Sequence, residues 1–201
     1  MQRLKSITLV IVLLSATILY SLPAEEAVGK FRARMLRLGK LTGVISWTSL
    51  EGQTYSGSFK YMAPDKIYVK FTSPSEKILV TNGKNLWIYS PGSALCGVQE
   101  LTPGSSSGGI AALVGGYEGI ASGDTAGYVI KLKNDDRVYR EIILSVDGTF
   151  LLKGAIFKRS DGRVISFSLS DVSATAEVNP ALFDFEVPKG ARIVTNPLQM
   201  R

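Results

Sequence analysis

The segment from Met62 to Pro91 reads MAPDKIYVKFTSPSEKILVTNGKNLWIYSP and contains three short apolar runs separated by turn residues. The runs cover residues 66–72, 77–81 and 85–90 and are rich in β-branched and aromatic side chains, which is typical of strands. Asn82-Gly83 separates two of them and favours a tight hairpin, because both residues tolerate positive φ. The segment therefore predicts neighbouring antiparallel strands, and it contains no obvious catalytic group.

Further strand-like segments flank this one on both sides. They cover residues 41–49, 54–62, 128–133, 138–146, 151–158 and 164–169. One helix is expected before them, from residue 27 to residue 38, with apolar side chains at helical spacing and Gly39 at its end. Consecutive hairpins form an antiparallel meander, and a long meander curls toward a barrel. The predicted fold class is mainly β, in the α+β group, with a single domain over residues 25–201.

The N-terminus has the three regions of a secretory signal peptide. Arg3 and Lys5 form a basic start, residues 7–19 are uncharged and mostly apolar, and Leu22-Pro23-Ala24 offers a cleavage site. The apolar run is short for a membrane span, which needs roughly 20 apolar residues, so an uncleaved anchor is only the alternative. The single cysteine, Cys96, lies far from this site, which excludes lipid attachment there. We expect residues 1–24 to be removed and the product to be exported and soluble.

A glycine-rich segment, residues 102–124, separates the two blocks of strands. It contains seven glycines around an apolar centre of Ile110, Leu113 and Val114. The glycines weaken any helix that forms there and make it easy to move. We interpret the segment as a helical lid, because long loops often serve as lids. The alternative is a flexible surface loop without a role.

The composition argues against several kinds of chemistry. The sequence contains no histidine, which excludes Ser-His and Cys-His pairs and histidine metal ligands. Residues 104–108 match G-x-S-x-G, but they lie in a glycine-serine loop and have no histidine base. The formal charge is +6, or +4 without Arg3 and Lys5, and the basic residues are scattered, which gives no support to nucleic-acid binding. We expect neither an enzyme nor a cofactor or metal site.

Short matches along the opening segment resemble the LolA family of periplasmic lipoprotein carriers. The matching positions are Pro64-Asp65, Pro74, Ile78-Leu79-Val80, Asn82-Gly83-Lys84, Leu86-Trp87 and Tyr89-Ser90-Pro91. Residues 179–194, NPALFDFEVPKGARIV, resemble the closing segment of the family with its F-x-F-x-x-P-x-G arrangement. The resemblance implies a half-open antiparallel β-barrel whose concave face is capped by the N-terminal helix and the glycine-rich lid, leaving an apolar cavity.

The resemblance also implies a function and partners. Family members accept acylated lipoproteins from an inner-membrane ABC transporter complex, cross the periplasm, and deliver them to an outer-membrane receptor lipoprotein. For this chain it implies a soluble, monomeric periplasmic carrier. One position departs from the family: the better-known members carry an arginine before the proline of the first turn, where it fastens the lid to the barrel, and this chain has Ala63.

Strand alternation indicates where a lipid would bind. On residues 66–72, Ile67, Val69 and Phe71 share one face, and the other face carries two lysines and is expected to be wet. Both faces of 85–90 are apolar, and our interpretation directs Trp87 and Tyr89 inward. The predicted lipid-binding residues are Phe31, Met35, Leu38, Ile67, Val69, Phe71, Leu79, Trp87, Tyr89, Ile110, Leu113 and Val114.

Two other functions stay open at this point. The same type of barrel suits a carrier of another amphiphile, such as a glycolipid or a free lipid. A barrel whose core is completely filled would instead indicate a structural or interaction protein of the periplasm without a ligand. The receptor of the same pathway is lipid-anchored, and the missing N-terminal cysteine argues against that role.

Overall fold

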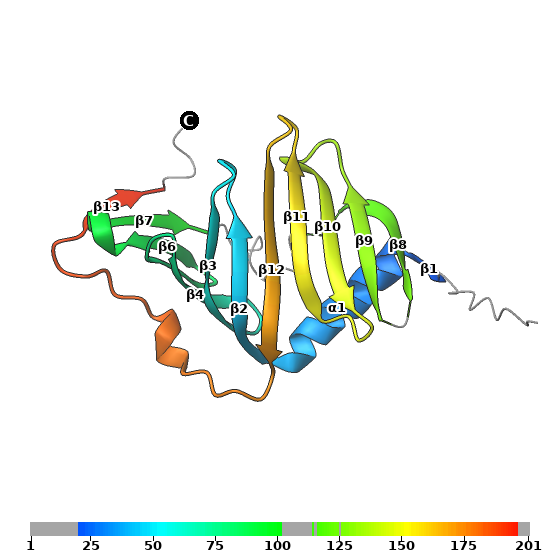
Figure 1. Cartoon of the computed structure of the whole chain (residues 1–201), viewed down its shortest axis with the longest axis horizontal. Helices are drawn as coiled ribbons and strands as arrows, with labels where there is room; N and C mark the ends of the chain where they lie inside the picture. The colour runs from blue at the N-terminus through cyan, green and yellow to red at the C-terminus, as the bar shows by residue number, and fades with distance from the viewer. Residues whose placement is uncertain (1–19, 102–113, 115, 125, 197–201) are drawn as a thin grey trace, which may run out of the picture.

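The computed structural model describes residues 20–101, 114, 116–124 and 126–196, and in this part of the chain 13 strands form one curled sheet (Figure 1). The strands are β1 (Tyr20–Pro23), β2 (Lys40–Thr48), β3 (Thr54–Met62), β4 (Lys66–Ser73), β5 (Lys77–Asn82), β6 (Asn85–Ser90), β7 (Leu95–Glu100), β8 (Glu118–Asp124), β9 (Gly127–Lys133), β10 (Tyr139–Asp147), β11 (Leu152–Arg159), β12 (Val164–Ser173) and β13 (Arg192–Thr195). The helices are α1 (Ala24–Leu38) and two short 3-10 turns, η1 (Pro91–Ser93) and η2 (Pro180–Phe183).

The two blocks of strands join through one pairing between segments far apart in the sequence. The order across the sheet is β1-β8-β9-β10-β11-β12-β2-β3-β4-β5-β6-β7-β13, so β12 lies beside β2. In this antiparallel pair Phe167 is opposite Trp47 and Leu169 is opposite Ile45. The sheet curls toward a barrel, as predicted. Within the described residues no pairing links β1 to β13, so the barrel is only half closed.

Helix α1 covers the β1, β8 and β9 end of the sheet. Its buried side chains, including Ala27, Phe31 and Met35, lie on one face, which confirms the predicted apolar stripe. The helix is three residues longer at its start than the predicted 27–38, and acidic residues in its first turn complement the positive end of the helix dipole. Gly39, with φ of 68°, ends it. None of the helices in the described ranges has the length and apolar content needed to cross a bilayer.

Strand β8 corrects the interpretation of the glycine-rich segment. Residues 118–124 were expected to belong to a lid, but they pair with β9 and β1. Gly119 and Gly123 allow this close pairing, because a side chain at either position would collide with the backbone of β9. These two glycines are required by packing, and the flexibility assumed from composition was wrong for them. In the rest of the predicted lid, residues 102–113 and 115 lie outside the described residues.

The other predicted strands and the Asn82-Gly83 turn are confirmed, with small shifts of the strand ends. Strands β3 and β6 have the predicted limits, and β12 extends four residues beyond its predicted end. Strands β1, β7 and β13 were not predicted. Strand β13 runs parallel to β7 at the edge of the sheet, a pairing that no local sequence signal indicates.

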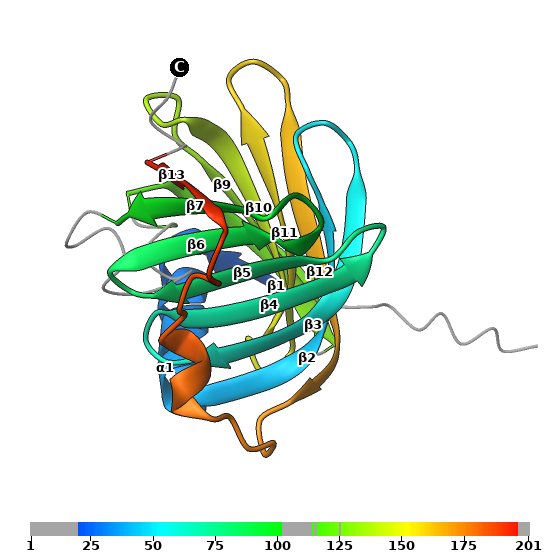
Figure 2. The same ribbon diagram turned by 90° about the vertical axis from the view of Figure 1, so that its left-hand side faces the viewer.

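Residues 174–191, the C-terminal strap, cross the convex face of the sheet over β2 to β7, on the side opposite α1 (Figure 2). Asn179 begins η2 by accepting a hydrogen bond from the Ala181 backbone N–H (3.0 Å). Phe183 is fully buried, and η2 packs against β4 and β5. Four buried apolar side chains lie outside the main core and form a second, smaller core on this face: Val80, Cys96, Val178 and Phe183.

Candidate binding cavity

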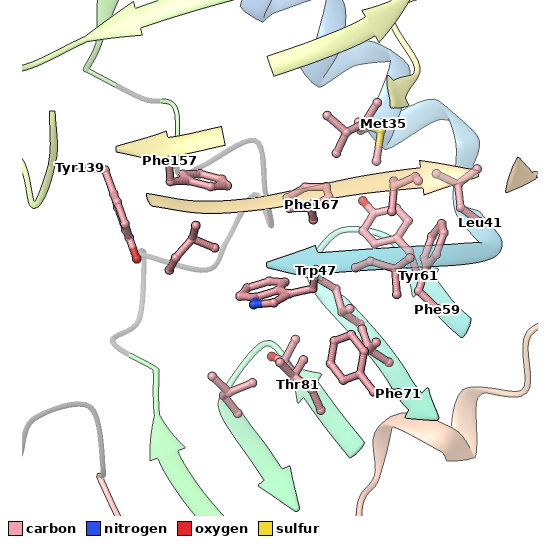
Figure 3. Close-up of a pocket in the computed structure, with 18 residues that line it drawn as sticks. Met35, Leu41, Trp47, Phe59, Tyr61, Phe71, Thr81, Tyr139, Phe157 and Phe167 are labelled. Carbon is pink, nitrogen blue, oxygen red and sulfur yellow. The ribbon is translucent and has the colours of Figure 1, made fainter. Parts of the chain in front are cut away.

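The concave face of the sheet encloses an apolar cavity of about 380 Å³ (Figure 3). This volume is within the range of about 300–1,000 Å³ that is usual for small-ligand sites. The lining residues are Met35, Leu41, Ile45, Trp47, Phe59, Tyr61, Ile67, Val69, Phe71, Leu79, Thr81, Leu86, Tyr139, Leu152, Phe157, Ile165, Phe167 and Leu169. They come from α1 and from both blocks of strands, so the cavity exists only because β12 pairs with β2.

Strand alternation directs the lining residues inward. On β4 the cavity is lined by Ile67, Val69 and Phe71, each two residues apart. The neighbouring strand β5 contributes Leu79 and Thr81 with the same spacing. Directly opposite residues of antiparallel strands share a face, and Val69 is opposite Leu79 in the β4–β5 pair. The register therefore builds a continuous apolar wall.

A row of four aromatic rings forms one side of the cavity. The centroids of Tyr139 and Phe157 are 5.5 Å apart, those of Phe157 and Phe167 are 6.3 Å apart, and those of Phe167 and Trp47 are 6.4 Å apart. The four side chains come from β10, β11, β12 and β2 (Figure 3). Ring pairs at these distances attract one another beyond the effect of burial alone, so the row makes a stiff apolar surface.

Two polar side chains of the cavity wall, Thr81 and Tyr61, are uncharged and hydrogen-bonded. The Oγ1 atom of Thr81 accepts a hydrogen bond from the Gly83 backbone N–H (3.1 Å). The Tyr61 hydroxyl donates to the Pro64 carbonyl (3.3 Å), and burial, together with the charge of Asp65, raises the pKa of Tyr61 to about 12. Within the described residues no cluster of three or more His, Cys, Asp or Glu side chains is placed to hold a metal ion. The apolar lining suits the binding of an apolar ligand.

Five of the predicted lipid-binding residues line this cavity: Met35, Ile67, Val69, Phe71 and Leu79. Phe31 and Leu38 pack in the same core without reaching the cavity, and Val114 is buried beside α1. Ile110 and Leu113 lie outside the described residues. The lipid-binding role of these residues stays a prediction.

The inward orientation predicted for Trp87 and Tyr89 is wrong. Leu86 lines the cavity instead, and it lies opposite Thr81, another lining residue. Trp87 and Tyr89 point to the convex face, where their ring centroids are 6.2 and 6.1 Å from that of Phe185 in the C-terminal strap. Residues 85–90 are apolar on both faces because neither face is open to water: one forms part of the cavity wall, and the strap covers the other.

The strap partly covers the second face of β4. This face carries Lys66, Tyr68, Lys70 and Thr72 and was predicted to be wet: Thr72 is exposed, and the other three residues are partly exposed. Tyr68 lies opposite the fully buried Val80, and η2 packs across β4 and β5. The sequence signal for this cover was Tyr68, an aromatic residue on the same face as two lysines.

Sequence reasoning missed the contribution of the second block and of β2. Trp47 and Phe167 are central to the cavity, but they were not among the predicted binding residues. The alternation of Ile165, Phe167 and Leu169 indicates an apolar face on that strand. It gives no indication that this face lies beside β2, because register between distant strands depends on the whole sheet.

Comparison with known proteins agrees with this architecture. Residues 46–186 match the family model described as outer membrane lipoprotein carrier protein LolA. The chain belongs to the LolA family. Among relatives named outer-membrane lipoprotein carrier protein, the one from Shewanella woodyi is 30% identical over 141 residues, which cover 68% of this chain and 67% of the relative. The outer-membrane lipoprotein carrier protein of Shewanella sediminis is 28% identical to this LolA-family chain over 192 residues, which cover 90% of this chain and 92% of the relative.

A solved structure shares the fold of this LolA-family chain. It is an uncharacterized conserved protein from Thermus thermophilus, with a TM-score of 0.57 and 14% sequence identity. The match covers 86% of this chain and 98% of the other. At this identity the likeness concerns the fold alone.

Proposed function

We propose that this protein is a lipoprotein carrier that holds acyl chains in the cavity on its concave face. The observation that supports the proposal is an apolar cavity of about 380 Å³ in a chain of the LolA family. An acyl chain of about 16 carbons, at roughly 0.8 kcal/mol per CH₂, costs more than about 10 kcal/mol to keep in water. A carrier must remove this cost with an apolar surface, and it needs no catalytic group.

The proposed route begins at an inner-membrane ABC transporter complex and ends at an outer-membrane receptor lipoprotein. Both steps require the cavity to open and close. The sheet is suited to this movement, because in the described residues neither β1 nor β8 pairs with β7 or β13. The outer edges of the two blocks can therefore move apart while β12 and β2 stay paired, and this holds whether or not β1 is removed. Transfer to the receptor then requires an apolar site that binds the acyl chain more tightly than this cavity does.

Export is the second part of the proposal. Cleavage after Ala24 removes β1 and leaves Glu25 and Glu26 in the first turn of α1, where their charges favour the helix. The mature protein is then a soluble periplasmic monomer of residues 25–201. N-terminal sequencing of the native protein after cell fractionation tests this, and recovery of an intact chain in membranes contradicts it.

The experiment for the carrier function compares two tryptophan variants. Leu79→Trp blocks the cavity, and Ser58→Trp places the same side chain on the exposed convex face as a control. Each protein is expressed from the full-length sequence in the organism that it comes from. The periplasmic form is purified, and mass spectrometry identifies the acylated lipoproteins and lipids bound to it. We expect acylated lipoproteins with the wild type and Ser58→Trp and far fewer with Leu79→Trp. Equal recovery from all three proteins contradicts carriage in this cavity.

A further inference from the structure

A lysine side chain lies at the rim of the apolar cavity, on the same face of the sheet as the lining residues. Lys77 begins β5, two and four residues before the lining residues Leu79 and Thr81. It lies directly opposite Phe71, which also lines the cavity. Residues 72–76, which include the last two residues of β4 and the turn before β5, are all exposed, so this end of the two strands is where the cavity wall meets water.

The ammonium group of Lys77 is held in place by an aromatic ring. Its Nζ atom donates to the Tyr55 hydroxyl (2.9 Å) and lies 4.3 Å from the centroid of the same ring. The Tyr55 hydroxyl in turn donates to Oε1 of Gln53. The Tyr55 ring contacts Phe71, with centroids 5.7 Å apart. Lys77, Tyr55 and Phe71 therefore connect the polar rim directly to the cavity wall, and we call these three residues the rim site.

The charge of Lys77 is available to a ligand. Within the described residues no carboxylate lies within ion-pairing distance of its ammonium group, whereas Lys70 on the convex face is paired with Glu76 (3.1 Å). Glu51 of the β2–β3 turn is fully exposed, and its charge interacts at longer range with both Lys77 and Arg163. An ammonium group has three N–H donors, and one of them is used by Tyr55.

We propose that the rim site binds the polar end of the ligand, so that an acyl chain enters the cavity while an oxygen acceptor at its head is held by Lys77. This inference rests on the proposed function, since it assumes that the cavity takes an acyl chain. The acceptor is a carboxylate or phosphate oxygen of a lipid, or an ester or amide carbonyl at the acylated end of a lipoprotein. A charged donor binds an ionised oxygen more strongly than it binds a neutral oxygen. The affinity of the rim site should therefore be highest for ligands with a negatively charged head.

Three ligands with the same chain and different heads test the rim site: dodecanoate, methyl dodecanoate and dodecylammonium. Each displaces a fluorescent acyl probe from the protein purified from the periplasm, at neutral pH and below the micelle concentration of the ligand. For the wild type we expect the affinity to fall in the order carboxylate, ester, ammonium. The carboxylate should bind about tenfold more tightly than the ammonium, which corresponds to one charged hydrogen bond. The relative affinities of the carboxylate and the ester show whether the site selects anionic lipid heads or accepts lipoprotein carbonyls equally.

The variants separate the charge of Lys77 from its packing. Lys77→Met removes the charge and keeps an apolar side chain of similar length, and it should bind all three ligands with nearly equal affinity. Lys77→Arg restores the charge and should restore the order. Lys70→Met removes one positive charge from the convex face and should leave the order unchanged. Thermal unfolding measured by circular dichroism confirms that each variant is folded.

The outcomes distinguish the rim site from the carrier function. If the wild type and Lys77→Met bind all three ligands equally well, acyl chains enter the cavity and the rim site is wrong. If Lys70→Met loses the order of ligand affinities as fully as Lys77→Met does, the preference comes from the net charge of the protein, and the proposal for the rim site is again wrong. If the wild type binds none of the three ligands, the carrier function fails and the rim site fails with it.

Discussion

The two faces of strands β4 to β6 differ in how they are covered. On the convex face the C-terminal strap covers part of the sheet, with Phe183 fully buried and Phe185 against Trp87 and Tyr89. On the concave face the same strands border a cavity of about 380 Å³. Strand β6 is apolar on both faces, so polarity alone does not explain the difference.

The comparison supports a division of roles in which one side of the sheet serves stability and the other, under the proposed function, serves binding. A covalently attached segment fills the convex face permanently, and its burial contributes to folding. The concave face stays partly unfilled, which lowers the stability of the free protein, and under the proposed function an acyl chain that occupies it would restore the missing contacts. The following predictions test this division of roles.

The largest effect is expected from Phe183→Ala on the convex face. Removing a fully buried ring from a filled core costs about 3–5 kcal/mol in the free energy of unfolding. Urea unfolding measures this loss, and displacement of an acyl probe at low temperature should show unchanged affinity. A large loss of affinity in the folded variant would mean that the strap also shapes the cavity.

A smaller loss of stability is expected from Phe71→Ala on the concave face. The Phe71 ring already borders the cavity, so its removal enlarges an existing space and eliminates fewer contacts, and we expect a cost of about 2 kcal/mol. Its affinity for an acyl probe should fall clearly. If Phe71→Ala destabilises the protein as much as Phe183→Ala and binds the probe normally, the two faces do not differ in function.

Alkaline pH should reveal the neutral hydroxyl group in the cavity wall. The pKa of Tyr61 is about 12 in the folded protein, above the ordinary value of 10.0, because of burial and the charge of Asp65. The folded state keeps this proton where the unfolded chain releases it, so stability falls as the pH rises from about 10 to about 12. Between these pH values the free energy of unfolding of Tyr61→Phe should fall by about 1–2 kcal/mol less than that of the wild type, as measured by urea unfolding. Equal losses would show that Tyr61 ionises as freely as an exposed tyrosine.

The smallest change in stability is expected from filling the cavity. Leu79→Trp adds volume next to the existing space and should change the free energy of unfolding by less than about 1 kcal/mol. Val80→Trp, at the adjacent position on the convex face, should cost about 3 kcal/mol because Val80 is fully buried beneath the strap. Similar costs for the two variants would mean that the concave face is as tightly packed as the convex one.

Local signals predicted most of the strands and the helix. The alternation of 66–72 and the turn Asn82-Gly83 depend on neighbouring residues, so a single stretch of sequence contains the information. The same alternation placed Ile67, Val69 and Phe71 on the face that lines the cavity. Composition misled where one residue type has two uses: Gly119 and Gly123 suggested flexibility, and the structure uses them for close strand pairing.

The sequence by itself determined the mainly β fold, the α1 helix and an apolar face on each strand, because these follow from side-chain period and turn chemistry. Only the tertiary structure decided which of two apolar faces is open. Leu86 and Trp87 lie on opposite sides of β6, and Phe185, nearly a hundred residues later, covers one side and leaves the other to the cavity. Likewise the pairing of β12 with β2 brought Phe167 to Trp47 and closed the cavity wall. Such contacts depend on the free energy of the whole sheet, and no local pattern encodes them.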